Sequence, residues 1–449
     1  MAPPIHDGAV LVDGDGRIVA VGPGDTVPTP DDAEQMDLGE AAILPGLVNA
    51  HAHPDLSFLR GGLEDLAFPD WIAALVHIRR QAGLHGDDFI AAARLSCVEM
   101  LAAGVTTVGA TEDSDGAFTA LRESGMRGIV YREVFGPDPS LAAASMDGLR
   151  LSIDAMRPGE TELVRAGISP HSPISVSDAL FAAAAEYALA QRLPVAVHTA
   201  ESTAERDLVV RGEGVFARRL AARGIATPVR GRSTVQLLER TRVLDCAPLL
   251  IHCVTVDADD VRRIADCRAA VVHCPVANAR LGHGVAPVTA MREAGITVAL
   301  GSDSVASNNR VDILEEARAA QLFQRATTGS PSVLPASDVV RMATLDGARA
   351  LGLDHVTGDL REGLDADLCA VRLGGAHTGP VHDPVAAVVH SARASDVALT
   401  VVRGRILHRN GTCLTIDAAA ALRAVQAVAD RIRPIVDALH VILEEPRDE

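Results

Sequence analysis

The stretch that decides the fold is ILPGLVNAHAHPDLSFLRGG, residues 43–62, in which an apolar run ends in His51 and His53. Successive side chains of a β-strand point to opposite faces, so two histidines two positions apart leave the strand on the same face. The end of one rigid strand would therefore aim two imidazole groups at one point. The pair raises the question of what two imidazole groups at the end of one strand would bind.

Seven further short aliphatic segments follow, each separated from the next by enough residues for a helix. The eight segments lie at residues 43–53, 104–111, 128–136, 165–173, 193–201, 248–254, 269–275 and 296–303. Intervening stretches such as 87–104 and 176–193 have the Ala- and Leu-rich composition and the apolar spacing of helices. Alternating strands and helices predict an α/β fold with a parallel sheet, and eight such units would close a (β/α)8 TIM-like barrel.

The two ends of the chain have a different character. Residues 8–22 pair two apolar runs across a Gly-Asp-Gly turn, and glycine and aspartate tolerate the positive φ angles of a hairpin. Residues 358–373 and 397–413 show the same short strands and glycine turns. We expect both ends to form halves of one small sheet domain that the barrel interrupts, followed by a terminal helix.

Composition limits the classes of partner. The 449 residues carry a formal net charge of -18, which repels nucleic-acid polymers and anionic membrane surfaces and favours a small-molecule substrate. No segment has the pattern of an export signal or of a membrane span. The 7 cysteines are odd in number and form no CxxC pair, which indicates reduced thiols and a cytoplasmic protein.

Polar residues stand at the C-terminal ends of six of the eight aliphatic segments, and in a barrel that rim is where active sites are built. These residues are His51, His53, His171, His198, His252, His273 and Asp303. An HxH pair alone is easily a chance feature of a polar loop. Because the histidines recur at so many strand ends, a shared site explains them better.

A metal ion is the simplest common target of these side chains. Imidazole and carboxylate groups together suit zinc or a similar divalent ion. We expect His51, His53, His198 and Asp303 to bind one such ion and to leave a position for water.

Two further residues are candidates for proton transfer. Glu201 follows His198 by three residues, where it would reach a water on the metal without binding the metal itself. Its alternative role is to cap the next helix. His252 could orient that water or share its proton with Asp303, or it could be an ordinary core histidine. We interpret His273 as a structural or supporting residue, and its role stays open.

Other chemistries lack their usual parts. The chain has no GxSxG elbow, no GxxxxGK[ST] loop and no GxGxxG after a strand, which argues against serine acyl transfer, nucleotide hydrolysis and dinucleotide redox chemistry. It also lacks the PCxxC motif of the zinc deaminases that act on nucleic-acid bases.

The motifs, taken in order, resemble a known family. They read LPGLVNAHAH, FLRGGLEDLAFPDWI, SPHSPISVS, HTAES, IHC, NARLGHGVAPV and LGSDSVASNNRVDILEE. The chain resembles the amidohydrolase superfamily over essentially its whole length, and within it the branch of S-adenosylhomocysteine/methylthioadenosine deaminases, aminodeoxyfutalosine deaminases and triazine hydrolases. The resemblance implies a β-sandwich from both chain ends (1–44 and 356–415), a metal-dependent barrel (45–355) and a C-terminal helix (416–449).

The resemblance also implies roles for individual residues. One zinc ion would be bound by the four residues named above, while Glu201 and His252, with Asp303, would handle protons. His171 and Arg132 match residues that contact the substrate in this branch, although either could instead be a supporting residue. Trp71, the single tryptophan, would stack on a purine or else cap the pocket as apolar bulk.

We therefore expect a cytoplasmic zinc-dependent aminohydrolase that releases ammonia from an adenine nucleoside-like or related heterocyclic amine. In the deaminases of this branch hydroxide adds to the amine-bearing ring carbon, the glutamate protonates the adjacent ring nitrogen, and ammonia leaves. The presence of Glu201 favours removal of an amine over hydrolysis of a cyclic amide or a C–Cl bond, which is the main alternative. A non-catalytic metal-binding scaffold ranks lower. The substrate and subfamily stay open, and a homodimer is the expected assembly.

Overall fold

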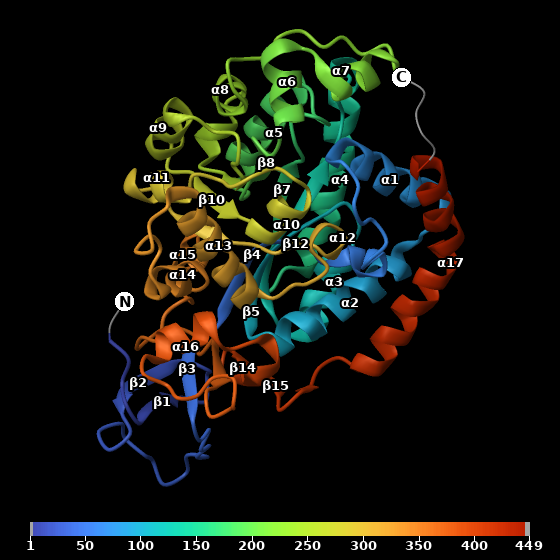
Figure 1. Ribbon diagram of the computed structural model, residues 1–449. Coiled ribbons are helices and arrows are strands. Elements are labelled where there is room, and N and C mark those ends of the chain that lie inside the picture. Colours follow the sequence, from blue (N-terminus) through green and yellow to red (C-terminus); the bar gives the residue numbers. More distant parts are fainter. Residues whose placement is uncertain (1–2, 445–449) are drawn as a thin grey trace.

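The computed structural model describes residues 3–444, so the outermost residues of the predicted first and last segments lie outside the described part. The chain forms a ring of parallel strands wrapped by helices, with a smaller antiparallel sheet domain at one end (Figure 1). This arrangement confirms the predicted fold class. The domain limits given above stay a prediction.

Eight strand positions form the ring. Its strands are β4 (Leu47–His53), β5 (Val105–Glu112), β6 (Arg127–Val134), β7 (Val164–Pro170), β8 (Ala196–Thr199), β9 (Leu249–His252), β10 (Ala270–His273), and β11 (Val298–Leu300) with β12 (Asp303–Ser304). A single parallel bridge between Ile168 and Val195 joins the β4–β7 sheet to the β8–β11 sheet. The segment 298–304 closes the ring, because β11 pairs with β10 and β12 pairs with β4.

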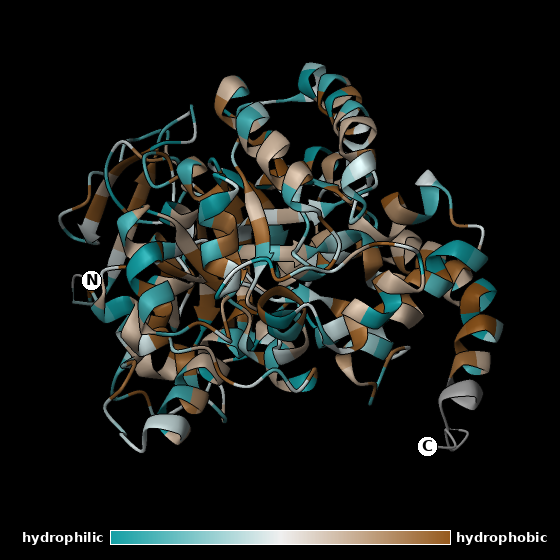
Figure 2. Ribbon diagram, turned by 90° about the horizontal axis from the view of Figure 1, so that it is seen from above, coloured by the Kyte–Doolittle hydropathy of each residue, from teal (hydrophilic) through white to brown (hydrophobic). Residues whose placement is uncertain are grey.

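Helices pack around the ring and over its C-terminal end. They are α1 (Phe68–Gln81), α2 (Gly86–Ala102), α3 (Gly116–Ser124), α4 (Ala142–Met156), α5 (Asp178–Gln191), α6 (Thr203–Arg211), α7 (Gly214–Ala221), α8 (Thr234–Arg240), α9 (Ala258–Asp266), α10 (Pro275–Arg280), α11 (Val288–Glu293), α12 (Val305–Asn308), α13 (Ile313–Thr328), α14 (Ala336–Met342) and α15 (Leu345–Ala350). A short 3-10 helix, η1 (Pro54–Leu59), follows β4 directly. In Figure 2 many of these helices mix hydrophilic and hydrophobic residues, as expected of helices with one buried face.

Helix α5 illustrates why these segments are helical. The Ser177 side chain caps its first turn by accepting a hydrogen bond from the backbone N–H of Leu180. Its buried residues recur every three or four positions, at Leu180, Phe181, Ala184, Ala185 and Ala188. They join the large aliphatic core between the ring and its helices.

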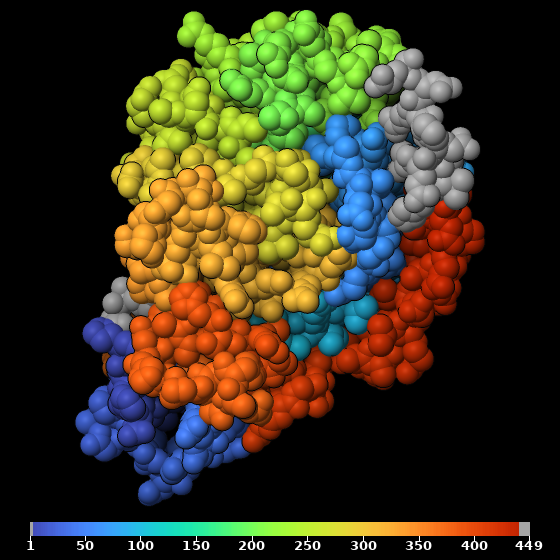
Figure 3. Space-filling model, in the orientation of Figure 1, coloured from blue at the N-terminus to red at the C-terminus, as the bar shows by residue number. Residues whose placement is uncertain are grey.

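The smaller domain combines segments from both ends of the chain. The strands β3 (Ala41–Pro45), β13 (Leu368–Arg372), β14 (Val397–Val402), β15 (Arg405–Arg409) and β16 (Thr412–Cys413) form a five-stranded antiparallel sheet. The predicted hairpin is confirmed as β1 (Gly8–Val12) paired with β2 (Ile18–Pro23). Figure 3 shows the N-terminal residues beside the later segments at this end of the molecule, where α16 (Pro384–His390) also lies (Figure 1).

A buried ion pair links the two domains. Arg127, at the start of β6, donates hydrogen bonds from Nε to Asp367 Oδ2 and from Nη2 to Asp365 Oδ2, each at 2.6 Å. Both carboxylates precede β13 of the smaller domain. The pair therefore fixes that domain against the end of the ring opposite the C-terminal strand ends.

The last helix, α17 (Ala418–Glu444), packs against α1, α2 and η1 along the outside of the barrel (Figure 1). Its buried residues Val425, Val428 and Ile432 join an apolar cluster with Phe58 and Trp71. This cluster braces η1, which begins directly after His53. None of the helices within residues 3–444 is both long enough and apolar enough to cross a membrane.

Candidate metal centre

Four of the predicted residues meet at the C-terminal end of the ring. Nε2 of His51 lies 3.3 Å and Nε2 of His53 lies 3.6 Å from Asp303 Oδ1. The Nε2 atoms of His53 and His198 are 3.4 Å apart. Ligand atoms 2.0–2.1 Å from a tetrahedral zinc ion are about 3.3 Å from one another. The three distances within this His/Asp cluster (His51, His53, His198 and Asp303) therefore match the separation of ligand atoms around one such ion.

The opposite edges of three of these four side chains are held by neighbours. His198 Nδ1 donates to the backbone carbonyl of His171 at 3.1 Å, and Ser307 Oγ donates to Asp303 Oδ2 at 2.7 Å. His51 Nδ1 lies 3.1 Å from the Thr111 hydroxyl. Its Nε2 is buried and has no hydrogen-bond partner among the described residues. Such contacts orient ligating histidines in metal sites, and the unpartnered nitrogen is what a cation would satisfy.

The pKa shifts favour the forms that bind a metal. Burial lowers the pKa of His53 to about 3 and that of His198 well below its ordinary value. Burial alone would raise the pKa of Asp303, but the neighbouring His51 side chain leads the effects that hold it below its ordinary value. Neutral imidazoles and an ionised carboxylate are the states that bind divalent ions.

Glu201 lies beside the cluster with two histidines. His283 Nε2 donates to Glu201 Oε1 at 3.2 Å, and His252 Nε2 lies 3.6 Å from the same oxygen. His252 Nδ1 donates to the amide oxygen of Asn278 at 2.9 Å, which turns Nε2 towards Glu201. Burial alone would raise the pKa of Glu201, but His252 and His283 hold it below its ordinary value.

Unusual backbone angles accompany these positions. Ala200, His252 and Asp303 have φ angles of 51°, 76° and 58°, in the left-handed region that non-glycine residues rarely occupy. All three stand where a strand passes into its loop. Backbone strain of this kind gathers at functional sites, where it serves to aim side chains.

The predicted substrate contacts fall in three different places. His171 joins the site, because its ring lies 4.7 Å from that of His198 and its Nδ1 is held by Ser175 Oγ at 2.7 Å. Trp71 lies farther back, with its indole N–H donating to the carbonyl of Ala306 at 3.1 Å. Phe68 stands between Trp71 and the site, since it stacks on Trp71 and contacts His283 edge-on.

The structure does not bring Arg132 to the cluster. Its guanidinium pairs with Asp115 at the start of α3 and donates to Met156 Sδ at the end of α4. Neighbouring residues of a strand face opposite sides, so Glu133 faces the inside of the ring instead. A carboxylate oxygen of Glu133 lies within 4.8 Å of ligating atoms of both His53 and His198.

Sequence reasoning missed three polar residues of this site, namely Glu133, Asn278 and His283. Asn278 and His283 lie in the motif NARLGHGVAPV, and Glu133 lies in VYREVFG. The sequence therefore marks these segments, but it does not show what these three side chains contact. His273, whose role was left open, is fully buried, and neither ring nitrogen has a hydrogen-bond partner in the described chain.

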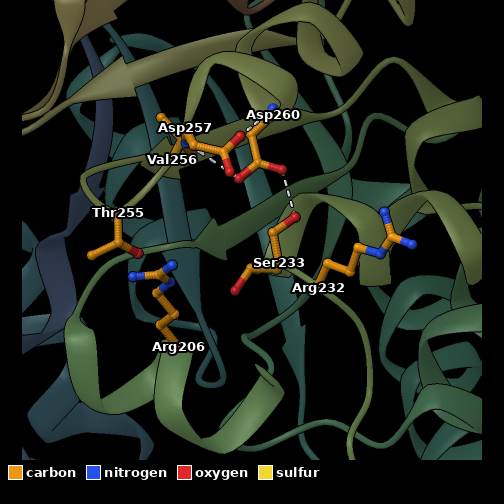
Figure 4. A pocket seen from close by; sticks show the side chains of 8 residues that line it. Arg206, Arg232, Ser233, Thr255, Val256, Asp257 and Asp260 are labelled. Atoms are coloured by element: carbon orange, nitrogen blue, oxygen red, sulfur yellow. Dashed lines mark hydrogen bonds between the residues drawn. The ribbon is translucent and has the colours of Figure 1, made fainter. Parts of the chain in front are cut away.

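A separate hollow of about 280 Å³ lies between α6, α8 and α9 (Figure 4). It is lined by Arg206, Arg232, Ser233, Thr234, Thr255, Val256, Asp257 and Asp260. None of the predicted site residues lines it, and the Asp260 carboxylate is bonded to Ser233 within it. The chemistry described above is therefore confined to the His/Asp cluster and its neighbours.

Comparison with known proteins agrees with this geometry. The amidohydrolase family matches residues 42–407, which is most of the chain. The chain belongs to the amidohydrolase family. The matched region holds the entire ring together with every residue of the site.

This amidohydrolase is similar to several named enzymes. It is 33% identical over 423 residues to the 5-methylthioadenosine/S-adenosylhomocysteine deaminase of Syntrophobacter fumaroxidans, covering 93% of this chain and 92% of that one. It is 30% identical over 440 residues to the 5'-deoxyadenosine deaminase of Methanosarcina barkeri, covering 97% and 95%. A zinc-bound adenosine deaminase from Xanthomonas campestris has a TM-score of 0.80 at 27% identity, covering 96% and 94%.

Proposed function

We propose that this amidohydrolase is a zinc-dependent aminohydrolase that removes an amine from an adenine nucleoside or a closely related heterocycle and releases ammonia. The observation that carries the proposal is the position of Glu201, which lies beside the His/Asp cluster and is held by His252 and His283. The named deaminases to which the chain is similar support this choice of substrate class.

In this proposal His51, His53, His198 and Asp303 hold one divalent ion. Their imidazole and carboxylate groups suit zinc, and three of their pair distances, at 3.3–3.6 Å, match the separation of ligand atoms around one ion. An ion bound there would lower the pKa of a water molecule and make hydroxide available near neutral pH.

Glu201 moves the proton. Its depressed pKa keeps it ionised at neutral pH, so it can first accept a proton from water and then deliver it to a ring nitrogen of the substrate. His252 and His283 hold the carboxylate in place, since both face the same oxygen, Oε1. His171 stands at the edge of the cluster, where it can contact the bound ring.

The cysteines bear on the cellular setting. All 7 cysteines are unpaired, which supports a reducing, cytoplasmic location. The homodimer expected from the commonness of twofold assemblies stays a prediction.

Ammonia release from a panel of amines tests the function. The zinc-loaded protein should release ammonia from at least one of adenosine, 5′-deoxyadenosine, methylthioadenosine, adenosylhomocysteine and aminodeoxyfutalosine. Glu201→Gln should lose roughly 100- to 10,000-fold in kcat while it retains bound zinc, because only the proton transfer is removed. A zinc-loaded protein inert to the whole panel, or a Glu201→Gln variant with full activity, would contradict the proposal.

A further inference from the structure

Glu133 is a buried carboxyl group for which the proposed mechanism has no use. It stands near the end of β6, and its side chain is 5% exposed. Its Oε1 atom is buried and has no hydrogen-bond partner among the described residues. Buried polar atoms are almost always hydrogen-bonded, so an orphaned carboxyl oxygen beside an active site points to a partner that arrives with a ligand.

Two other polar groups share its surroundings. His171 Nε2 lies 3.9 Å from Glu133 Oε1, while the Nδ1 of the same ring is already bonded to Ser175. Ser169 lies opposite Glu133 in the parallel register of β6 and β7, so the two side chains leave the sheet on the same face. The Ser169 hydroxyl is also buried without a hydrogen-bond partner in residues 3–444.

Glu133 stands at the edge of the His/Asp cluster rather than within it. A carboxylate oxygen of Glu133 lies within 4.8 Å of ligating atoms of His53 and His198, so the side chain borders the cluster. Glu201 already occupies the place of the proton carrier, and His252 and His283 contact it there. The proposed metal ligands and proton carrier therefore leave Glu133 without an assigned role.

The surrounding charges favour a hydrogen-bond donor. Asp55, Glu112 and Asp113 are close enough to act on Glu133 electrostatically, and Arg79 offsets them only in part. A carboxyl group accepts hydrogen bonds in either protonation state. The local environment therefore suits an O–H or N–H group and disfavours an anionic one.

We propose that Glu133, supported by Ser169 and His171, is a specificity-determining residue that accepts a hydrogen bond from an O–H or N–H donor of the substrate other than the amine that leaves. The proposal rests on the proposed aminohydrolase function. The donor is either a sugar hydroxyl or a ring N–H, and both present the same chemistry to the carboxyl oxygen. A substrate without that donor would leave Glu133 buried and unpaired.

A thermodynamic cycle between protein and substrate tests the assignment. Glu133→Ala and the wild type are assayed with adenosine, 2′-deoxyadenosine and 3′-deoxyadenosine for the sugar, and with guanine and 1-methylguanine for the ring. Glu186→Gln, on the exposed face of α5, serves as the control for a lost carboxylate. Bound zinc is measured in every preparation.

The expected result is coupling between residue and donor. Glu133→Ala should lower kcat/KM by about 10- to 100-fold for the substrate that carries the donor, mainly through KM, because the buried donor would be left without its hydrogen-bond partner. Removing the donor from the substrate should lower the kcat/KM of the wild type by a similar factor. It should not lower the kcat/KM of the variant any further. Zinc content should not change.

Two outcomes would overturn the assignment. Loss of zinc in Glu133→Ala would make Glu133 a metal ligand, and an equal loss on every substrate would make it a positioning residue. The same cycle can be measured without turnover. The dissociation constants of the same compounds are determined by calorimetry for Glu201→Gln and for the double variant that also carries Glu133→Ala. If the wild type releases no ammonia, the proposed function fails, but the binding cycle still tests whether Glu133 accepts a hydrogen bond from the ligand. Absence of coupling in that cycle would overturn the inference alone.

Discussion

Removing the His283 side chain should shift the pH dependence of the reaction. His283 Nε2 donates to Glu201 Oε1 at 3.2 Å, and the two side chains are 2% and 8% exposed. His283→Leu deletes one charge-assisted hydrogen bond to a buried carboxylate, worth about 1.5–3 kcal/mol. Because one pKa unit corresponds to about 1.36 kcal/mol, the pKa of Glu201 should rise by about 1–2 units.

The sign of the effect follows from the role of Glu201. Glu201 must be ionised to accept the first proton, so a higher pKa shrinks the active fraction at low pH. The acid limb of kcat/KM should therefore move to higher pH by about 1–2 units, while the activity near the alkaline end stays closer to that of the wild type. The assay is ammonia release measured across pH with the zinc-loaded protein.

A matched variant separates the hydrogen bond from the packing of this side chain. His283→Gln keeps an N–H donor in the same place and should keep most of the wild-type profile. Thermal unfolding of both variants shows whether the contact of His283 with Phe68 has been disturbed. An acid limb at the same pH in His283→Leu and in the wild type would refute the reasoning.

Three further changes test the stability of the fold. Arg127→Met leaves Asp365 and Asp367 buried without their partner and should lower the free energy of unfolding in urea by about 3–5 kcal/mol. Burial raises the pKa of Glu316 from 4.5 to about 8, so its contribution to stability is lost as the pH rises through that range; Glu316→Gln should flatten the fall in unfolding temperature there. Trp71→Phe removes the indole donor to a backbone carbonyl in α12 and should cost about 1 kcal/mol in the same urea titration.

The ring and most of the cluster could be predicted from the sequence because the signals are local. An aliphatic run that ends in a polar residue marks both a strand and its C-terminal end. Strand alternation alone predicts that His51 and His53 point to the same side. Because active sites of such barrels lie at the C-terminal ends of the strands, His198 and Asp303 are expected beside them. Ring closure brings these distant segments together, since β12 pairs with β4.

The remaining residues depend on details that one sequence does not contain. Arg132 and Glu133 are neighbours, and only the register of β6 against its helices decides that Glu133 faces the ring interior while Arg132 pairs with Asp115. His283 reaches Glu201 from the loop after α10, whose path no periodic pattern reveals. The sequence leaves open whether Trp71 stacks on the substrate or caps the pocket as apolar bulk, and only the packing of Phe68 against it shows which side chain stands in front.

The central claim is that His51, His53, His198 and Asp303 share one divalent ion. Anomalous X-ray diffraction from zinc-loaded crystals at the zinc absorption edge tests it most directly. We predict a single strong peak about 2.0–2.2 Å from the three Nε2 atoms and from a carboxylate oxygen of Asp303. A peak elsewhere in the barrel, or zinc bound without these four side chains, would contradict the account.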